Sequence, residues 1–181
     1  MERMDDGLVD LVITSPPYNM NLRIRNGEYC SRQIVDEFST KYQDFSDNLP
    51  IEKYNSFHTK VLRELLRVSN LVFYNIQIVT GSKRSVFKMI GDFSEYLKDI
   101  IIWDKGVSQP AMQELVLNRQ SELLTNFSDE SSLVYDPFMG TGTTALACKM
   151  LKRNYIGSEI NKTYIDISDD RLGNSGQMWI F

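Results

Sequence analysis

Residues 134–144, VYDPFMGTGTT, decide the fold that this sequence predicts. A short apolar run at 133–135 stops at an Asp-Pro pair, and a turn bracketed by Gly140 and Gly142 leads into ALACKMLKR (145–153), which has the composition of a helix. Glycines in a turn let the backbone approach a ligand closely, and the first amides of a helix are open to a carboxylate or phosphate. The order strand, glycine turn and helix therefore predicts a nucleotide-type pocket.

A second short strand, within NYIGSEI at 154–160, ends in Glu159. This acid lies 19 residues beyond Gly140, close to the ~20-residue spacing at which an acid on the next strand tip reaches a ribose hydroxyl. Taken singly, Gly140 and Gly142 are equally consistent with an ordinary turn, and Glu159 with a solvated acid. The leading strand, the helix and the spacing together favour the pocket.

A buried strand is also predicted at 8–14, LVDLVIT, and it runs directly into Ser15, Pro16, Pro17 and Tyr18. Two prolines after a strand cannot extend a β-ladder, and they hold the chain in a rigid turn. This turn would hold the Ser15 hydroxyl, the Pro16 carbonyl and the Tyr18 ring at a strand's carboxyl end, where open α/β sheets have their active sites. A plain strand-terminating turn is the alternative.

Helical and extended patterns alternate along the rest of the chain. Helices are predicted at 50–68, 82–93 and 161–172, and strands at 71–76 and 100–103. Residues 107–132 fit either one amphipathic helix or a short helix followed by a broken strand. The alternation predicts an α/β fold, with a doubly wound, mainly parallel Rossmann-like sheet in a single compact domain, 1–181. His58 falls one step off the apolar stripe of its helix and is expected to be partly exposed.

The composition is that of an ordinary globular protein, with 42% hydrophobic and 24% charged residues among 181. No apolar run approaches the ~20 residues of a membrane span, and the acidic start MERMDDG is unlike a signal peptide, so a cytoplasmic protein without a membrane partner is expected. Cys30 and Cys148 are expected to be reduced thiols. With a single histidine, the sequence predicts no metal site.

The net charge of −4 means that any nucleic acid would have to bind a local basic patch. One candidate lies at 19–34, where Arg23, Arg25 and Arg32 face a single acid, Glu28. A solvated loop with scattered arginines is an equally good interpretation of this stretch.

Three stretches together resemble the motifs of the β-type amino-group DNA methyltransferases, which use S-adenosylmethionine to methylate the exocyclic amine of adenine or cytosine. TSPPYN at 14–19 resembles their catalytic motif, DPFMGTGTT at 136–144 their cofactor loop, and YIGSEI at 155–160 their ribose-binding strand. The catalytic motif precedes the cofactor motif, as it does in the β-type members.

This resemblance implies roles for individual residues. Tyr18 would stack on a target base flipped out of DNA, while the Ser15 side chain and the Pro16 carbonyl accept hydrogen bonds from its amine. The cofactor would be S-adenosylmethionine, with Glu159 at its ribose; the residues implied for the cofactor are Asp136, Pro137, Phe138, Gly140, Gly142, Thr143 and Glu159. DNA is the expected partner, and a homodimer stays open, as does the choice between adenine and cytosine.

The chain departs from the family between its two motif halves. The catalytic-motif half spans about 8–106 and the cofactor-motif half about 133–172, and the connector, 107–132, is too short for the target-recognition region that family members carry there. Two other functions therefore stay open: a remnant without catalysis that binds the cofactor or a partner, and a methyltransferase acting on RNA, protein or a small amine.

Overall fold

The structure is a computed structural model, and it describes residues 1–19, 23–25, 28–30, 37–38, 48–79, 81–103 and 112–173. Its contacts divide the chain into two compact units. The first unit consists of Met1–Pro16, Leu62–Asn75 and Leu97–Phe181, and the second of Pro17–Val61 and Ile76–Tyr96. Each unit therefore combines segments that are distant in the sequence.

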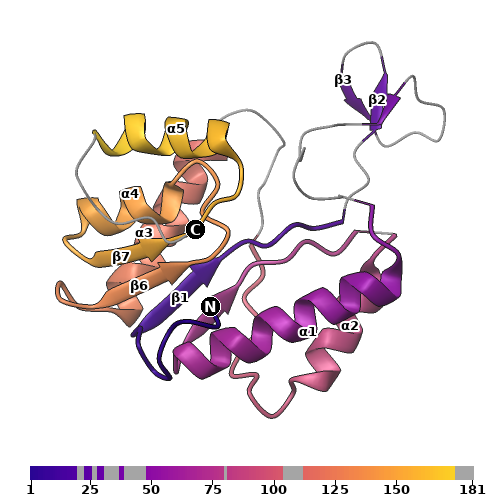
Figure 1. Ribbon diagram of the computed structural model, residues 1–181, viewed down its shortest axis with the longest axis horizontal. Helices are drawn as coiled ribbons and strands as arrows, with labels where there is room; N and C mark the ends of the chain where they lie inside the picture. The colour runs from indigo at the N-terminus through magenta and orange to yellow at the C-terminus, as the bar shows by residue number, and fades with distance from the viewer. Residues whose placement is uncertain are drawn as a thin grey trace. The chain divides into compact units, whose positions relative to one another are not determined.

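The first unit contains a sheet of four parallel strands (Figure 1). Their order across the sheet is β5-β1-β6-β7, with bounds Val72–Tyr74, Leu11–Thr14, Leu133–Asp136 and Asn154–Gly157. All four residues of β1 are buried. Strands covered on both faces read as continuous apolar runs, which is why LVIT forms the centre of a parallel sheet. The predicted parallel α/β sheet is confirmed.

The order of the strands reverses between β1 and β6. From β1 the chain continues to β5 on one side, whereas β6 pairs with the opposite side of β1 and continues to β7. In open α/β sheets such a switch point leaves a crevice at the carboxyl ends of the two strands, because their connections lead away in opposite directions. Here those ends are Thr14 and Asp136.

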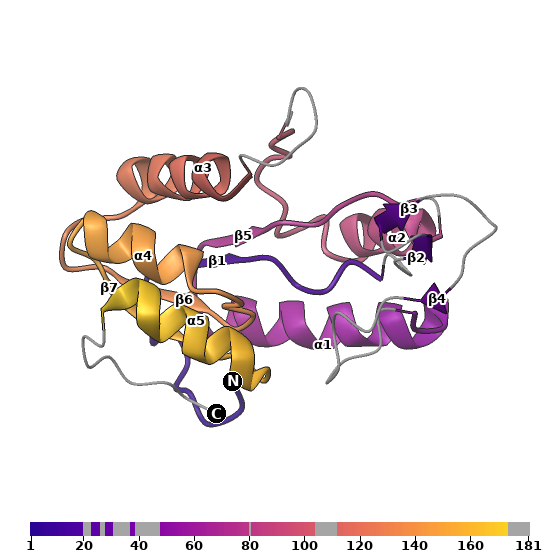
Figure 2. The same cartoon turned by 90° about the horizontal axis from the view of Figure 1, so that it is seen from above.

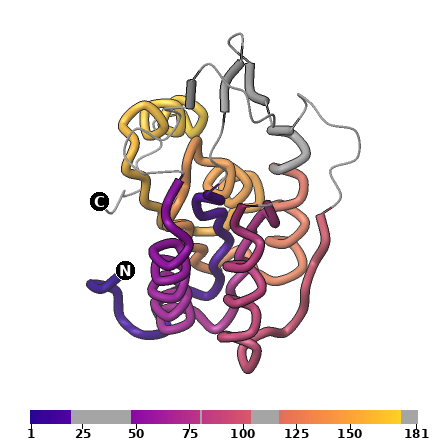
Figure 3. Tube along the Cα trace, turned by 90° about the vertical axis from the view of Figure 1, so that its right-hand side faces the viewer, coloured from indigo at the N-terminus to yellow at the C-terminus, as the bar shows by residue number. Residues whose placement is uncertain are grey.

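Helices lie on both sides of this sheet. Figures 2 and 3 show α3 (Met112–Phe127) and the C-terminal half of α1 (Ile51–Val68) on opposite sides of β1. Helix α4 (Thr143–Met150) packs against α3, β7 and α5 (Lys162–Leu172). Within the interval that could be read in two ways, residues 112–127 thus form one helix. Its Leu124 is completely buried, in a core cluster shared with strands β1 and β6.

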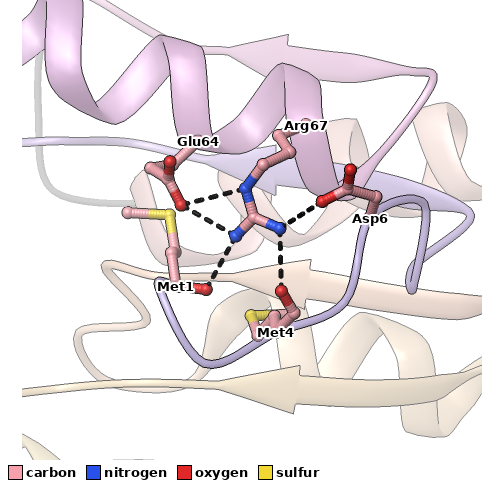
Figure 4. A network of polar contacts seen from close by, with 5 residues as sticks. All are labelled: Met1, Met4, Asp6, Glu64 and Arg67. Atoms are coloured by element: carbon pink, nitrogen blue, oxygen red, sulfur yellow. Dashed lines mark hydrogen bonds and ion pairs between the residues drawn. The ribbon is translucent and has the colours of Figure 1, made fainter.

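The N-terminal segment is tied to the end of α1 by Arg67 (Figure 4). The guanidinium of Arg67 donates to the carboxylates of Asp6, at 2.6 Å, and Glu64, at 2.8 Å, and to the carbonyl oxygens of Met1 and Met4. The hydrogen bond from Arg67 lowers the pKa of Glu64. A guanidinium carries five N–H donors in one plane, so a single arginine can hold the chain segment before β1 at several points.

The second unit contains α2 (Lys83–Asp92), the N-terminal half of α1 and a small antiparallel sheet of order β3-β2-β4. The strands of this sheet are β2 (Arg23–Arg25), β3 (Glu28–Cys30) and β4 (Glu37–Phe38). Asn55 of α1 accepts a hydrogen bond from Ser85 of α2. No strand was predicted within 19–34, where β2 and β3 lie, because three-residue strands give too short a pattern to recognise.

The predicted strand at 100–103 is wrong. Residues 97–103 lie outside every strand, and Ile102 is 87% exposed. A run of isoleucines has high β-propensity, but a strand forms only where a neighbouring strand supplies its hydrogen bonds and packing. Among the described residues, β5 pairs with β1 and has no strand on its other side.

The expectation of a partly exposed His58 is also wrong, since only 2% of this residue is exposed. The buried face of α1 is centred on Tyr54, and His58 lies one turn further along the same face. The Tyr54 and His58 rings meet edge to face with centroids 4.2 Å apart. Burial lowers the pKa of His58 from 6.5 to about 4, because the charged imidazolium would lose its hydration.

Acid should therefore destabilise the protein through His58. Between pH 6.5 and about 4 the unfolded chain binds a proton that the folded one does not, so stability is complete above pH 6.5 and falls as the pH drops toward 4. The full loss is about 3 kcal/mol. Urea unfolding of the wild type and His58→Gln across this range would measure it. We expect a flatter pH dependence for the variant, and parallel curves would contradict the assignment.

Candidate active site at the carboxyl edge of the sheet

Ser15 directly follows β1, and Asn75 of the neighbouring strand end holds it. The Asn75 side-chain Nδ2 donates to Ser15 Oγ at 2.9 Å, and the Asn75 backbone N–H donates to the Thr14 carbonyl at 2.9 Å. Asn75 was not predicted from the sequence as a site residue. The sequence feature that could have identified it is a polar residue at the end of an apolar strand, LVFYN, next to the strand that carries the Ser-Pro-Pro turn.

Asp136, at the end of β6, accepts hydrogen bonds from both sides of the switch point. The hydroxyl of Thr14 donates to Oδ1 and the hydroxyl of Thr144 to Oδ2, each at 2.6 Å, and the Phe138 N–H donates to Oδ1 at 3.1 Å. Only 4% of Asp136 is exposed. Burial raises the pKa of Asp136, although the three hydrogen bonds favour the carboxylate and oppose the rise.

The backbone of the glycine turn is left-handed at both of its glycines. Gly140 and Gly142 have φ of 54° and 78°, the left-handed region in which a side chain is strained. Gly142 is the N-cap residue of α4 and supplies no side-chain cap, so the helix begins at Thr143 without one. The turn is also tied to the end of β7, because the Met139 N–H donates to the Ser158 carbonyl at 3.0 Å.

Glu159 lies against this turn. Its Oε2 accepts a hydrogen bond from the Gly140 N–H at 2.7 Å, and its Oε1 accepts one from the Asn161 N–H at 2.8 Å. Asn161 caps α5, where its side chain accepts from the Tyr164 N–H. The spacing between Gly140 and Glu159 thus corresponds to direct contact between the glycine turn and the acid of the next strand.

Helix α5 supports the glycine turn through two residues that were not predicted from the sequence. Arg171 donates from Nη1 to the Thr141 carbonyl at 2.6 Å and to the Thr141 hydroxyl at 3.1 Å. Ser168 is completely buried, and a Cβ on Gly142 would clash with its hydroxyl. The helical pattern of 162–172 indicated a helix but not which of its residues face the turn.

Pro17 and Tyr18 belong to the second unit, whereas Ser15 and Pro16 belong to the first. The Pro17 carbonyl accepts from the Tyr54 hydroxyl at 3.0 Å, and the Tyr18 carbonyl accepts from Ser82 at 3.4 Å. The Asn19 side chain exchanges two hydrogen bonds with the backbone of Leu49, at 2.6 and 3.0 Å. The backbone that carries Tyr18 is thus fixed by α1 and by the start of α2.

The other site predictions have different outcomes. Arg23 and Arg25 lie on β2, and Arg32 lies outside the described residues. Cys148 is a buried free thiol whose pKa burial raises to about 12. In the described part of the chain, no three His, Cys, Asp or Glu residues gather as a metal site would require. The described helices include none long and apolar enough to span a membrane.

Within the first unit, one edge of the sheet brings together the end of β1 with Ser15, the turn from Asp136 to Thr143, and Glu159. A glycine turn and an acid on successive parallel strands, beside a topological switch point, define a Rossmann-like α/β fold with a nucleotide-type site. This is the class of protein to which the chain's fold and site assign it.

Comparison with known proteins narrows the class. A family model described as DNA methylase, that of the N6 and N4 methyltransferases, matches residues 9–127 and 119–170. The chain belongs to this DNA methylase family. An orphan methyltransferase of Bacillus amyloliquefaciens, M.BamHII, is 49% identical over 51 residues, which are 28% of this chain and 19% of that protein. The matched stretches span less than a fifth of the first curated relatives' lengths.

Solved structures agree in fold. The crystal structure of M1.HpyAVI superposes with a TM-score of 0.56 at 20% identity, over 94% of this chain and 89% of the other. The cytosine-N4-specific PvuII DNA methyltransferase gives 0.55 at 15% identity, over 94% and 81%. At such identities the likeness establishes the fold alone.

Proposed function

We propose that this chain transfers a methyl group from S-adenosylmethionine to the exocyclic amine of adenine or cytosine in DNA. The observation that carries the proposal is the hydrogen bond between Thr14 and Asp136 at 2.6 Å. It joins Thr14, the residue before Ser15, to Asp136, the last residue of β6 before the glycine turn. The Ser-Pro turn and the cofactor turn therefore open at the same edge of one sheet. A methyl donor and an acceptor must meet in this way for transfer in line.

The residues of the glycine turn fit the proposed cofactor. A Cβ on Gly140 would meet no atom within 4 Å, so a ligand can approach the backbone there. The start of α4 has no side-chain cap, and its first amides suit a carboxylate such as that of a methionine moiety. Each oxygen of Glu159 accepts one backbone hydrogen bond, which leaves a lone pair on each for ribose hydroxyls.

Asp136, Pro137, Phe138, Gly140, Gly142 and Thr143 would line the methionine side of this cofactor, and Glu159 would hold its ribose. Once bound, S-adenosylmethionine supplies an electrophilic methyl group on a sulfonium. M1.HpyAVI has also been solved in complex with S-adenosylmethionine, and that structure superposes on the present chain with a TM-score of 0.52. The proposal for this chain rests on its own glycine turn and Glu159.

Ser15 would orient the acceptor amine. The hydroxyl oxygen of Ser15 has two acceptor positions, and Asn75 occupies one of them. The second position can accept an N–H of the target amine, as can the Pro16 carbonyl, and this directs the nitrogen lone pair toward the methyl group. Because serine is a weaker proton acceptor than aspartate, the proton that leaves the amine passes to water. Positioning of this kind contributes up to about 7–11 kcal/mol to catalysis.

The remaining roles concern the nucleic acid. Tyr18 would stack on the flipped base, and Arg23, Arg25 and Arg32 would bind the phosphate backbone. With a net charge of −4, binding must depend on such a local patch. Raising the salt concentration should weaken it steeply, since each neutralised phosphate releases counterions.

A second candidate function is a cofactor-binding remnant with weak or no catalysis. It is favoured by the two matched segments of the family model, which overlap at 119–127, inside the single helix α3. A member with the whole family pattern would be expected to match in one piece. We propose that α3 joins two family elements that a recognition region separates in longer members, so that this chain does not discriminate DNA sequences.

Two measurements distinguish the candidates. Calorimetric titration with S-adenosylmethionine tests cofactor binding, and transfer of labelled methyl groups to unmethylated DNA tests catalysis. Binding with transfer supports the methyltransferase, and binding without transfer supports the remnant. An absence of binding by the folded protein would reject both. Transfer to RNA or a small amine, with none to DNA, would instead assign a different acceptor to the same site.

A further inference from the structure

Asp136 links the end of β1 to the start of α4, although the resemblance counts it among the cofactor ligands. One carboxylate oxygen accepts from Thr14, the last residue of β1, and the other accepts from Thr144, in the first turn of α4. Both threonines are 1% exposed. Hydrogen bonds of 2.6 Å to a carboxylate are charge-assisted and among the stronger ones in proteins.

The carboxylate of Asp136 is largely saturated by the protein itself. It has about four lone-pair positions, of which the two threonine hydroxyls and the Phe138 N–H occupy three. A buried acceptor with these partners contributes little direct binding to a ligand. It does fix the distance between the end of β1 and the start of α4, because moving either would cost the buried carboxylate one of its hydrogen bonds.

We propose that Asp136 is a positioning residue that couples the Ser15 turn to the cofactor turn through the hydroxyls of Thr14 and Thr144. The consequence for methyl transfer rests on the proposed function: a displacement of about 1 Å between two reacting groups can lower a rate by about a hundredfold. The coupling itself is a property of the folded chain and exists without cofactor or DNA.

The coupling can be measured by hydrogen exchange of the full chain without ligand. Thr144→Val, on the cofactor side, should speed exchange in the peptide at 11–18, and Thr14→Val should speed it in the peptide at 137–142. We expect about tenfold in each case, since each variant removes one hydrogen bond to a charged acceptor. Thr125→Val is the matched control. Thr125 is exposed on α3, where its hydroxyl donates to the Ser121 carbonyl, and its loss should change neither peptide.

Kinetics give a second readout that loss of structure alone would not produce. With cofactor bound, Thr14→Val should lower kcat about a hundredfold while the Kd for S-adenosylmethionine changes less than about threefold. Thr144→Val should instead raise that Kd, because Thr144 lies in the first turn of α4, directly after the cofactor turn. Thr14→Ser and Thr144→Ser keep the hydroxyl and should restore most of each loss.

Two results would overturn the proposal. One is faster exchange only in the segment that carries the substitution, and the other is valine variants with the same exchange and kinetics as their serine counterparts. The two valine variants test the link from opposite ends, so one of them suffices if the other does not fold. If the wild type binds no cofactor, the proposed function fails, and the exchange of the free protein still decides whether Asp136 couples the two turns.

Discussion

Replacing Ser15 with alanine is expected to lower the rate of methyl transfer by about a hundred- to a thousandfold. The hydroxyl oxygen is the side-chain acceptor at this position, and Asn75 holds it in place at 2.9 Å. Alanine removes that acceptor, so the target amine loses the hydrogen bond that directs its lone pair. The Kd for S-adenosylmethionine should stay within about twofold of the wild type, because the variant leaves Asp136, Gly140 and Glu159 unchanged.

Two further variants sharpen this experiment. Tyr18→Ala should likewise abolish most transfer with little change in cofactor affinity, since it removes stacking worth about 1–3 kcal/mol per base. Ser56→Ala is the control, because Ser56 lies on the exposed face of α1. Calorimetry gives the affinities and single-turnover assays the rates. Gly140→Val serves as the reference, because its side chain would fill the space assigned to the cofactor and should weaken binding strongly. If Ser15→Ala and Tyr18→Ala lose as much cofactor affinity as Gly140→Val, the division between catalytic and cofactor residues is refuted.

Gly142→Ala is expected to destabilise the protein more than Gly140→Ala, although both glycines belong to the same turn. At Gly140 the cost is the left-handed backbone alone, about 1–2 kcal/mol, because a Cβ there meets nothing within 4 Å. At Gly142 the new methyl group would also clash with the hydroxyl of Ser168 and lie 3.0 Å from its Cβ. Overpacking adds about 1–3 kcal/mol, for a total of about 2–5 kcal/mol.

The two glycine variants should also differ in cofactor binding. A methyl group at Gly140 occupies space that we assign to the ligand, so Gly140→Ala should weaken affinity at a modest cost in stability. Thermal unfolding and calorimetry measure the two effects. Ser168→Ala is the control: its hydroxyl is buried without a hydrogen-bond partner in the described part of the chain, so its removal should be nearly neutral and should partly rescue Gly142→Ala. Equal destabilisation by both glycine variants would contradict the clash.

The correct predictions from the sequence share a local origin. Residues 11–13 (LVI) and 133–135 (LVY) form continuous apolar runs, and the helix from Ile51 to Val68 repeats its apolar residues at helical spacing. Such patterns predict a strand or a helix because the element depends only on residues close together in the sequence and on a core to pack against. The incorrect prediction at 100–103 had the same local pattern, but no described strand pairs with it.

The sequence by itself determined the parallel sheet, the glycine turn and the acid 19 residues further on. Each of these depends on residue types at fixed spacing along the chain. Only the tertiary structure decided that Thr14 and Asp136, 122 residues apart, share a hydrogen bond, and that Asn75 and Arg171 hold the turns beside them. Those contacts depend on which strands become neighbours, and pairing between distant segments is set by the packing of the whole core and not by any one stretch of sequence.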